Sequence, residues 1–181
     1  GASHHFISTV DDIAWLFNLR GSDVSYNPVF LAHALIDATS ATLFVANGKV
    51  PAEVAARLQS DGVAVQDYAQ AGPALDGLPT SAVLLLDPRR VTLGLRESAP
   101  ATVKVVEAIN PTVLLKSRKG AAEAAHVRAA MEQDGAAMCA FYAWFEAAQG
   151  KERITELTID ERLTATRAKR PGFVGLSFNT I

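Results

Sequence analysis

Four histidines are the side chains most able to bind a metal or transfer a proton. His4 and His5 are adjacent, so in a strand they point to opposite sides and cannot easily share a metal. His33 lies inside an apolar run, which predicts a core histidine with a satisfied hydrogen bond. His126 follows Glu123 by three residues, so both could lie on one helical face, and Glu-x-x-His motifs bind metals in some helix bundles. Because the motif occurs once, we predict no metal site here.

Other reactive residue types have simpler interpretations. Cys139 is the only cysteine, so no internal disulfide can form, and its apolar helical surroundings predict a buried thiol in a reducing compartment. Asp11 and Asp12 could act as an acid–base pair, but their position before an apolar helical pattern favours a helix start. The zinc motif HExxH, the P-loop, GxGxxG and GxSxG do not occur.

The bulk composition is that of an ordinary globular protein. Its 181 residues carry a formal net charge of -2, which argues against nucleic-acid and anionic-membrane partners. The only local basic run lies between Lys116 and Lys119, and we interpret it as a solvated helix end. No apolar run approaches the length of a membrane span.

The first two-thirds of the chain alternates between strand-like and helix-like segments. Strands are predicted at 6–8, 29–36, 42–46, 63–65, 83–86 and 103–106. Helices are predicted after Asp11, from Pro51 to Leu58, and after Asp87-Pro88, where aspartate would be the N-cap. The segment 70–79 is predicted to be a loop. This alternation indicates an α/β sandwich with a mixed sheet over residues 1–110.

The pattern becomes helical after Asn110-Pro111, so we place a domain boundary near residue 110. The alanine-rich segment 117–148 predicts one long helix that ends before Gly150. Its apolar stripe comprises Val127, Met131, Met138, Phe141 and Phe145. Thr158 with Glu161 resembles a capping box for a second helix, and the tail 173–181 resembles the start of a strand. Residues 111–181 are therefore expected to supply two helices and a strand that do not complete a domain.

Two stretches of sequence resemble the aminopeptidase P (Xaa-Pro aminopeptidase) family. The first runs from Val10 through Asp12, Trp15, Asn18, Arg20, Gly21, Asp23 and Asn27-Pro28 to Phe30. The second comprises Asn110-Pro111, Lys116-Ser117, Glu123, Arg128-Ala129, Thr155-Glu156 and the segment Phe173–Phe178. The first resembles the opening of the middle domain, and the second resembles the junction and first helices of the pita-bread catalytic domain.

The resemblance implies a fold and an activity. The fold of residues 1–110 would be that of the creatinase amino-terminal domain, a ribonuclease-H-like sandwich, and 111–181 would begin a truncated catalytic domain. The complete enzyme removes an N-terminal residue that precedes proline, using two divalent metals, usually manganese. In the family's order, every metal ligand and catalytic residue follows the segment that ends at Phe178. We therefore expect no catalytic residue, no metal ligand and no activity in this chain, which would be a cytoplasmic piece of the enzyme.

The resemblance also singles out the loop Arg20–Pro28 as a candidate substrate-channel loop. Its polar or amphipathic residues are Arg20, Asp23, Tyr26 and Asn27. One interpretation is an internally hydrogen-bonded connector in which Arg20 pairs with Asp23 and Asn27 caps backbone groups. The other is that Arg20 lines the channel and orients the peptide.

Three functions are compatible with this fold. The first is a metal-dependent Xaa-Pro aminopeptidase whose partners are peptides with proline second, and which could form a homodimer. The second is a non-enzymatic peptide- or protein-binding module, because metal-free relatives of this fold bind peptides or histones. The third is creatinase or prolidase, which share the fold. The amino-acid sequence from Trp15 to Phe30 favours aminopeptidase P over creatinase and prolidase.

Overall fold

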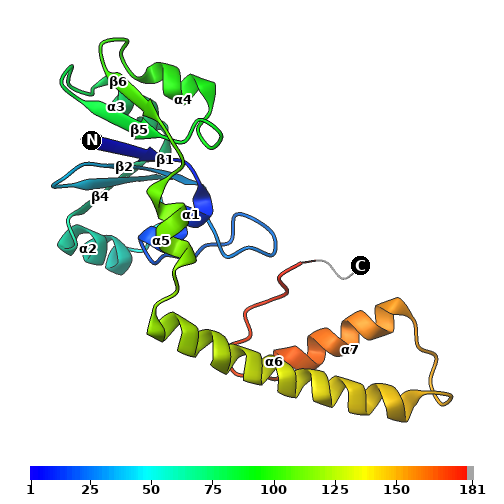
Figure 1. Cartoon of the computed structure of the whole chain (residues 1–181). Helices are drawn as coiled ribbons and strands as arrows, with labels where there is room; N and C mark the ends of the chain where they lie inside the picture. Colours follow the sequence, from blue (N-terminus) through cyan, green and yellow to red (C-terminus); the bar gives the residue numbers. More distant parts are fainter. Residues whose placement is uncertain (179–181) are drawn as a thin grey trace. The chain divides into compact units, whose positions relative to one another are not determined.

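The computed structural model describes residues 1–178, which form two compact units (Figure 1). The first unit comprises Gly1–Val24 and Pro28–Arg118. The second comprises Ser25–Asn27 and the chain from Lys119 onward. Among the described residues, no helix combines the length and apolar character needed to cross a membrane.

The first unit contains six strands and five α-helices with a short 3-10 turn. Its strands are β1 (His4–Ile7), β2 (Ala32–Ile36), β3 (Ala41–Val45), β4 (Val63–Asp67), β5 (Val83–Leu86) and β6 (Lys104–Glu107). Its helices are α1 (Val10–Leu16), α2 (Ala52–Ser60), η1 (Tyr68–Gln70), α3 (Ala71–Asp76), α4 (Leu93–Ser98) and α5 (Pro111–Ser117).

The strands form one mixed sheet in the order β4-β3-β2-β1-β5-β6. β1 and β3 each run antiparallel to β2, whereas the pairs β3–β4, β1–β5 and β5–β6 are parallel. In the register of β1 and β2, His5 lies opposite Ile36 and Ile7 opposite Ala34. The sequence prediction of an α/β sandwich with a mixed sheet is confirmed.

Each face of the sheet is covered by its own hydrophobic cluster. Adjacent residues of a strand point to opposite faces, and Phe6 and Ile7 accordingly belong to different clusters. Phe6 packs with Leu75 of α3, whereas Ile7 packs with Ile13 of α1 and Leu58 of α2. Helices therefore cover both faces, and the loops at the strand ends carry the polar residues.

The second unit is a helical hairpin formed by α6 (Ala121–Ala148) and α7 (Glu156–Ala168), as Figure 1 shows. Gly150 has a φ of 72° in the connection, which agrees with the predicted helix end there. The Arg162 guanidinium lies 5.1 Å from the centroid of the Trp144 ring, so a cation–π contact joins the two helices.

Residues 111–118 group with the first unit, although we predict the domain boundary near residue 110. No helix is predicted over residues 111–116, because Pro111 marks the predicted break, whereas proline is favoured at the first position of a helix. Between residue 110 and residue 178 the structure therefore has three helices, where two were expected. The division into a domain of residues 1–110 and the start of another at 111–181 stays a prediction.

Two predicted helix starts are wrong. Asp87 forms a single turn, in which its carboxylate accepts the Arg89 amide at 3.0 Å, and α4 begins only after Thr92, whose hydroxyl accepts the Leu95 amide at 3.4 Å. Helix α7 is capped by Thr155 rather than Thr158, since the Thr155 hydroxyl accepts the Thr158 amide at 3.3 Å.

Three further local predictions are wrong. Residues 71–76 form α3 despite Gly72 and Pro73, because Ala71 and Leu75 are buried against the sheet. Cys139 is exposed rather than buried, although it lies in an apolar stretch of α6. The described part of the tail, 173–178, forms no strand, and residues 179–181 lie outside the described residues.

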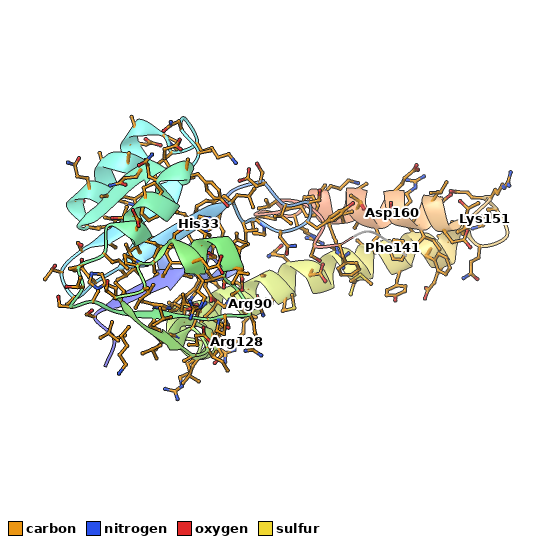
Figure 2. The ribbon with its side chains drawn as sticks, turned by 90° about the horizontal axis from the view of Figure 1, so that it is seen from above. His33, Arg90, Arg128, Phe141, Lys151 and Asp160 are labelled. Atoms are coloured by element: carbon orange, nitrogen blue, oxygen red, sulfur yellow. The ribbon has the colours of Figure 1, made fainter. Side chains whose placement is uncertain are left out.

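Part of the apolar stripe on α6 is exposed. Val127 and Met131 are 54% and 60% exposed, whereas Phe141 is 6% exposed and stacks on Phe145. Figure 2 labels Phe141 on this helix. The stripe is therefore core near Phe141 and surface near the start of the helix.

Candidate functional site

The loop between α1 and β2 is tied to α1 by Arg20. After α1 ends, Asn18 adopts a φ of 50°, which turns the chain. Arg20 Nη1 donates hydrogen bonds to the carbonyl oxygens of Ala14 and Leu19, at 3.0 and 2.9 Å. Because carbonyl groups at the C-terminus of a helix lack partners, this positive group stabilises the end of α1.

Gly21 closes the base of the loop. Its amide donates to the Pro28 carbonyl at 3.2 Å, so the two arms of the loop lie against each other. A Cβ atom at Gly21 would lie 2.7 Å from Cβ of the buried Phe30. Only glycine permits this approach without a shift of the opposite arm.

Asp23 joins the outgoing arm of the loop to the returning arm. Its amide donates to the Val29 carbonyl at 3.1 Å, and its Oδ2 accepts the Leu31 amide at 2.8 Å. The same oxygen forms an ion pair with Lys49 Nζ. The hydrogen bond from Lys49, followed by that from Leu31, lowers the pKa of the Asp23 carboxyl below its ordinary value.

The interpretation in which Arg20 pairs with Asp23 is therefore wrong. Each side chain has other partners: Arg20 bonds to α1, whereas Asp23 bonds to Leu31 and Lys49. Both side chains bond to groups outside the segment 20–28 and thereby connect the loop to its surroundings. Arg20 therefore anchors the start of the outgoing arm to α1, and Asp23 anchors its other end to Leu31 and Lys49.

The tip of the loop holds the other two predicted residues. Ser25 and Tyr26 form a turn flanked by the bridge residues Val24 and Asn27. Tyr26 has a φ of 65° and is 42% exposed, and Asn27 is exposed. A tyrosine in the left-handed region is uncommon, so the tip holds a sparsely populated backbone conformation of the kind that occurs at ligand-contacting turns.

A second polar cluster lies between α1 and α5 and is centred on Asp12, which is fully buried. Asp12 Oδ2 accepts the Thr112 hydroxyl at 2.9 Å, and Lys116 Nζ lies 2.8 Å from Oδ1. Lys116 also pairs with the exposed carboxylate of Asp11. Although burial lowers the pKa of Lys116, bonds from these two aspartates raise it above its ordinary value.

Asn110 extends this cluster to the sheet. Its amide nitrogen donates to Thr9 Oγ1 at 3.2 Å and lies 3.5 Å from Asp12 Oδ2, while its Oδ1 is 3.1 Å from His5 Nε2. Burial lowers the pKa of His5, and the bond from Asn110 opposes this effect in part. The two predicted roles of Asp12 and Lys116, a helix start and a solvated helix end, thus understate what these side chains do.

His33 is a core histidine, as predicted (Figure 2). Its Nδ1 is 2.8 Å from the Ser8 hydroxyl, and its ring lies 4.6 Å from the Tyr68 ring and 5.5 Å from the Phe6 ring, centroid to centroid. Burial lowers the pKa of His33, which favours the neutral ring. These contacts give it a packing role.

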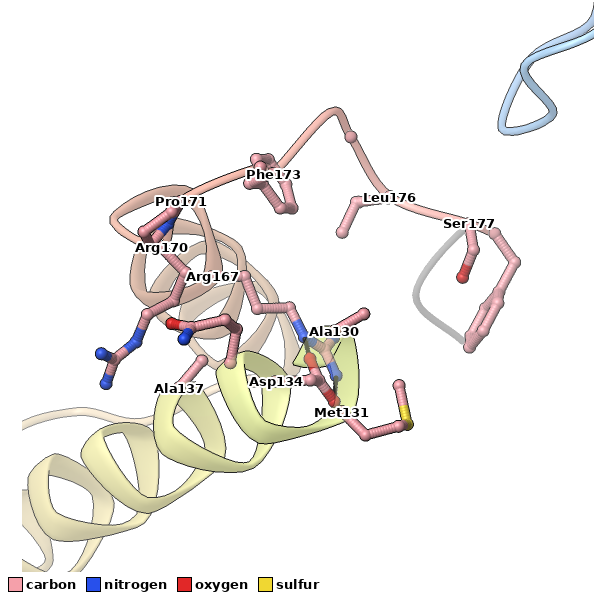
Figure 3. A pocket seen from close by; sticks show the side chains of 14 residues that line it. Ala130, Met131, Asp134, Ala137, Arg167, Arg170, Pro171, Phe173, Leu176 and Ser177 are labelled. Carbon is pink, nitrogen blue, oxygen red and sulfur yellow. Dashed lines mark hydrogen bonds and ion pairs between the residues drawn. The ribbon is translucent and has the colours of Figure 1, made fainter. Parts of the chain in front are cut away.

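A hollow of about 350 Å³ lies within the second unit (Figure 3). It is bounded by α6, the end of α7 and the segment 170–178. Arg167 crosses its floor, with Nε 2.7 Å from Asp134 Oδ1 and Nη2 3.3 Å from Oδ2. This bidentate pair joins α7 to α6, and the remaining lining is largely apolar, including Met131, Phe173 and Leu176. The polar side chains of Gln133, Arg170 and Ser177 also line the hollow.

The residues that could hold a metal do not come together in the described part of the chain, residues 1–178. No group of three or more His, Cys, Asp or Glu side chains lies close enough to bind an ion there. Glu123, part of the Glu-x-x-His pair, instead accepts the Gly120 amide at 2.9 Å and caps the start of α6. The described residues, 1–178, therefore do not form the dinuclear centre, whose ligands the resemblance places after Phe178.

Sequence reasoning missed Lys49 and Asn110. Lys49 lies 26 residues from Asp23, and Asn110 lies 98 residues from Asp12. Neither residue has a local pattern that indicates its partner. Only the folded chain brings the β3–α2 turn beside the loop, and the segment after β6 beside α1, so only the fold could have indicated these pairs.

The fold and the loop define a class: a mixed-sheet α/β domain with helices on both faces and a short polar loop, followed by a helical hairpin. The Creatinase/Prolidase N-terminal domain family matches residues 1–123. The chain belongs to this family.

Curated relatives match nearly the whole chain. A protein of Botryotinia fuckeliana called probable Xaa-Pro aminopeptidase P is 38% identical over 184 residues, which cover 97% of this chain and 28% of that protein. The corresponding protein of Sclerotinia sclerotiorum is 35% identical over 189 residues, which cover 99% of this chain and 31% of that protein. The chain thus spans less than a third of the length of these relatives.

Solved structures show the same fold. An X-prolyl aminopeptidase from Caenorhabditis elegans, described as a cytosolic enzyme with a di-nuclear active site, superposes with a TM-score of 0.88 at 21% identity. It covers 98% of this chain, which corresponds to 30% of that enzyme. An Xaa-Pro dipeptidase from Bacillus anthracis has a TM-score of 0.67 at 13% identity, over 93% of this chain and 45% of that chain.

Proposed function

We propose that this chain is the non-catalytic domain and the first helices of a metal-dependent Xaa-Pro aminopeptidase. The observation that carries the proposal is the 38% identity to a probable Xaa-Pro aminopeptidase P over 97% of this chain. The complete enzyme would remove the N-terminal residue from peptides in which proline is second. The mixed-sheet domain would border the active site of the complete enzyme and would contribute no catalytic residue to it.

The complete enzyme would use two divalent metals, with manganese as the expected ion. Support comes from the di-nuclear active site named for the C. elegans enzyme. That enzyme is also described as cytosolic, which supports a cytoplasmic location for this protein. A homodimer is the assembly that we propose.

The loop Arg20–Asn27 would border the channel through which the peptide reaches the metals. Arg20 and Asp23 are occupied by bonds within the first unit, so they would hold the loop in place. Asn27 is exposed at the tip, where its carboxamide can hydrogen-bond a peptide backbone, and Tyr26 beside it is 42% exposed. Arg20 retains donors beyond Nη1 that could orient a substrate carbonyl.

The experiment uses the longer protein, with an Xaa-Pro peptide and an Xaa-Ala peptide as substrates. Wild-type protein should release the first residue of the Xaa-Pro peptide alone and should lose activity in a chelator. Arg20→Ala should lower kcat/KM roughly tenfold or more, because positioning errors near 1 Å are costly, while metal content is unchanged. Absence of turnover in the wild type would refute the aminopeptidase proposal. Unchanged kinetics with a lowered melting temperature would leave Arg20 a structural role only.

A further inference from the structure

We infer that Lys49 is a positioning residue for the candidate substrate-channel loop, which it holds through Asp23. This inference rests on the proposed function, because it assigns Lys49 a role at the same channel. Lys49 lies outside the loop, in the turn between β3 and α2.

The turn that carries Lys49 has a defined shape. β3 ends at Val45, Gly48 adopts a φ of 80°, and the Lys49 amide donates to the Ala46 carbonyl at 3.3 Å. The Asn47-Gly48 pair accounts for this shape, since both residues tolerate positive φ angles. The backbone on which Lys49 stands is therefore constrained by its own turn and is independent of the loop that Lys49 contacts.

One carboxylate oxygen joins three segments of the chain. Asp23 Oδ2 accepts the Leu31 amide at 2.8 Å and pairs with Lys49 Nζ. Leu31 directly precedes β2, and Lys49 follows β3, so Asp23 connects the loop to the ends of two adjacent strands. The loop is consequently held at two places, by Arg20 on α1 and by Asp23 on the strand ends.

The ion pair between Lys49 and Asp23 differs from an ordinary surface ion pair because it fixes the position of a loop. The side chains of Lys49 and Asp23 are 40% and 20% exposed, and exposed ion pairs contribute little to global stability. However, removal of Lys49 leaves Asp23 with the Leu31 amide as its remaining side-chain partner. We expect the loop to become more mobile without a measurable change in the melting temperature of the domain.

A more mobile loop would then change kcat/KM of the enzyme. When the tip residues Tyr26 and Asn27 contact the peptide, a looser anchor at Asp23 widens the range of positions that the tip can adopt. Positioning contributes to the reaction only when the group is held near its productive geometry. Lys49 would therefore influence kcat/KM without touching the substrate.

The first measurement is hydrogen exchange of the 181-residue chain, followed at the amides of Asp23 and Leu31. Lys49→Met should speed their exchange several-fold, because the accepting carboxylate loses its charged partner. Lys49→Arg, which keeps the charge, should restore slow exchange. Lys104→Met is the matched control, since Lys104 is an exposed lysine on β6. Exchange at Leu31 that is equal in the wild type and in Lys49→Met would overturn the inference.

The second measurement is the kinetics of the longer protein on an Xaa-Pro peptide. Lys49→Met should lower kcat/KM roughly three- to tenfold with unchanged metal content and melting temperature, and Lys49→Arg should recover most of it. Faster exchange with unchanged kinetics would show that Lys49 anchors the loop but positions nothing, which would overturn the inference. An inactive wild-type protein would refute the proposed function itself, whereas the exchange data would still decide whether Lys49 anchors the loop.

Discussion

Asp12 lies in the first turn of α1, and its side chain is fully buried. As a residue in the first turn of α1 it has a small favourable effect on the helix, about 0.3–1 kcal/mol. In the folded protein its fully buried carboxylate is bonded to Thr112 and paired with Lys116. It therefore fastens α5 to α1 across nearly 100 residues of sequence. A buried charge of this kind is tolerated only when its partners are present.

Replacement of Asp12 should accordingly be costly. We expect Asp12→Asn to lower the free energy of unfolding by about 3 kcal/mol, because Lys116 loses its buried partner. Asp11→Asn is the matched control: its side chain is 57% exposed, and the change should cost less than about 1 kcal/mol. Urea unfolding followed by circular dichroism measures both. Equal, small losses in the two variants would show that the cluster does not secure α5.

At the scale of elements, the apolar pattern predicted most strands well. Strand β5 is the clearest case, because Val83–Leu86 is a continuous apolar run that lies between β1 and β6 inside the sheet. Helix ends were predicted less well. Asp87-Pro88 and Thr158-x-x-Glu161 each satisfy a capping pattern, yet in both cases a neighbouring threonine, Thr92 or Thr155, provides the cap.

The reason is that each segment offers more than one residue that can cap a helix, and the local pattern does not decide which of them does. Residues 71–76 form a helix against composition because Leu75 is fully buried on the sheet. The candidate loop could be predicted as a unit from its residues. Its anchors could not, since Lys49 and the carbonyl groups of α1 reach it only through the folded chain.

The cap of α7 gives a direct test at this scale. Thr155→Ala should destabilise the first turn of α7 by about 1 kcal/mol, because the Thr158 amide loses its acceptor. Thr158→Ala should have a smaller effect, since residue 158 lies inside the helix, where alanine is favoured. Hydrogen exchange of the amides at the start of α7 compares the two variants. A larger effect of Thr158→Ala would restore the capping box that the sequence suggests.

At the scale of the whole molecule, the helical hairpin retains apolar surface. Val127 and Met131 are more than half exposed, as are Tyr142 and Leu157. Apolar side chains that gather on one helix commonly mark a surface that is covered by another part of a protein or by another copy.

This surface should cause the chain to self-associate at high concentration. Static light scattering of the 181-residue chain should show an apparent mass that rises with concentration, because burial of such side chains is favourable. Replacement of Val127 and Met131 by glutamine should weaken the association. A mass that stays monomeric in the wild type at high concentration would count against this prediction.

The most direct test of the account is a manganese titration by calorimetry, run on the 181-residue chain and on the longer protein, with turnover of an Xaa-Pro peptide measured on the same samples. The account predicts stoichiometric binding and metal-dependent turnover for the longer protein. For the chain alone it predicts neither, because no metal-ligand cluster forms among residues 1–178. Tight one-to-one or two-to-one binding by the chain, or metal-dependent release of the residue before proline by the chain, would contradict it.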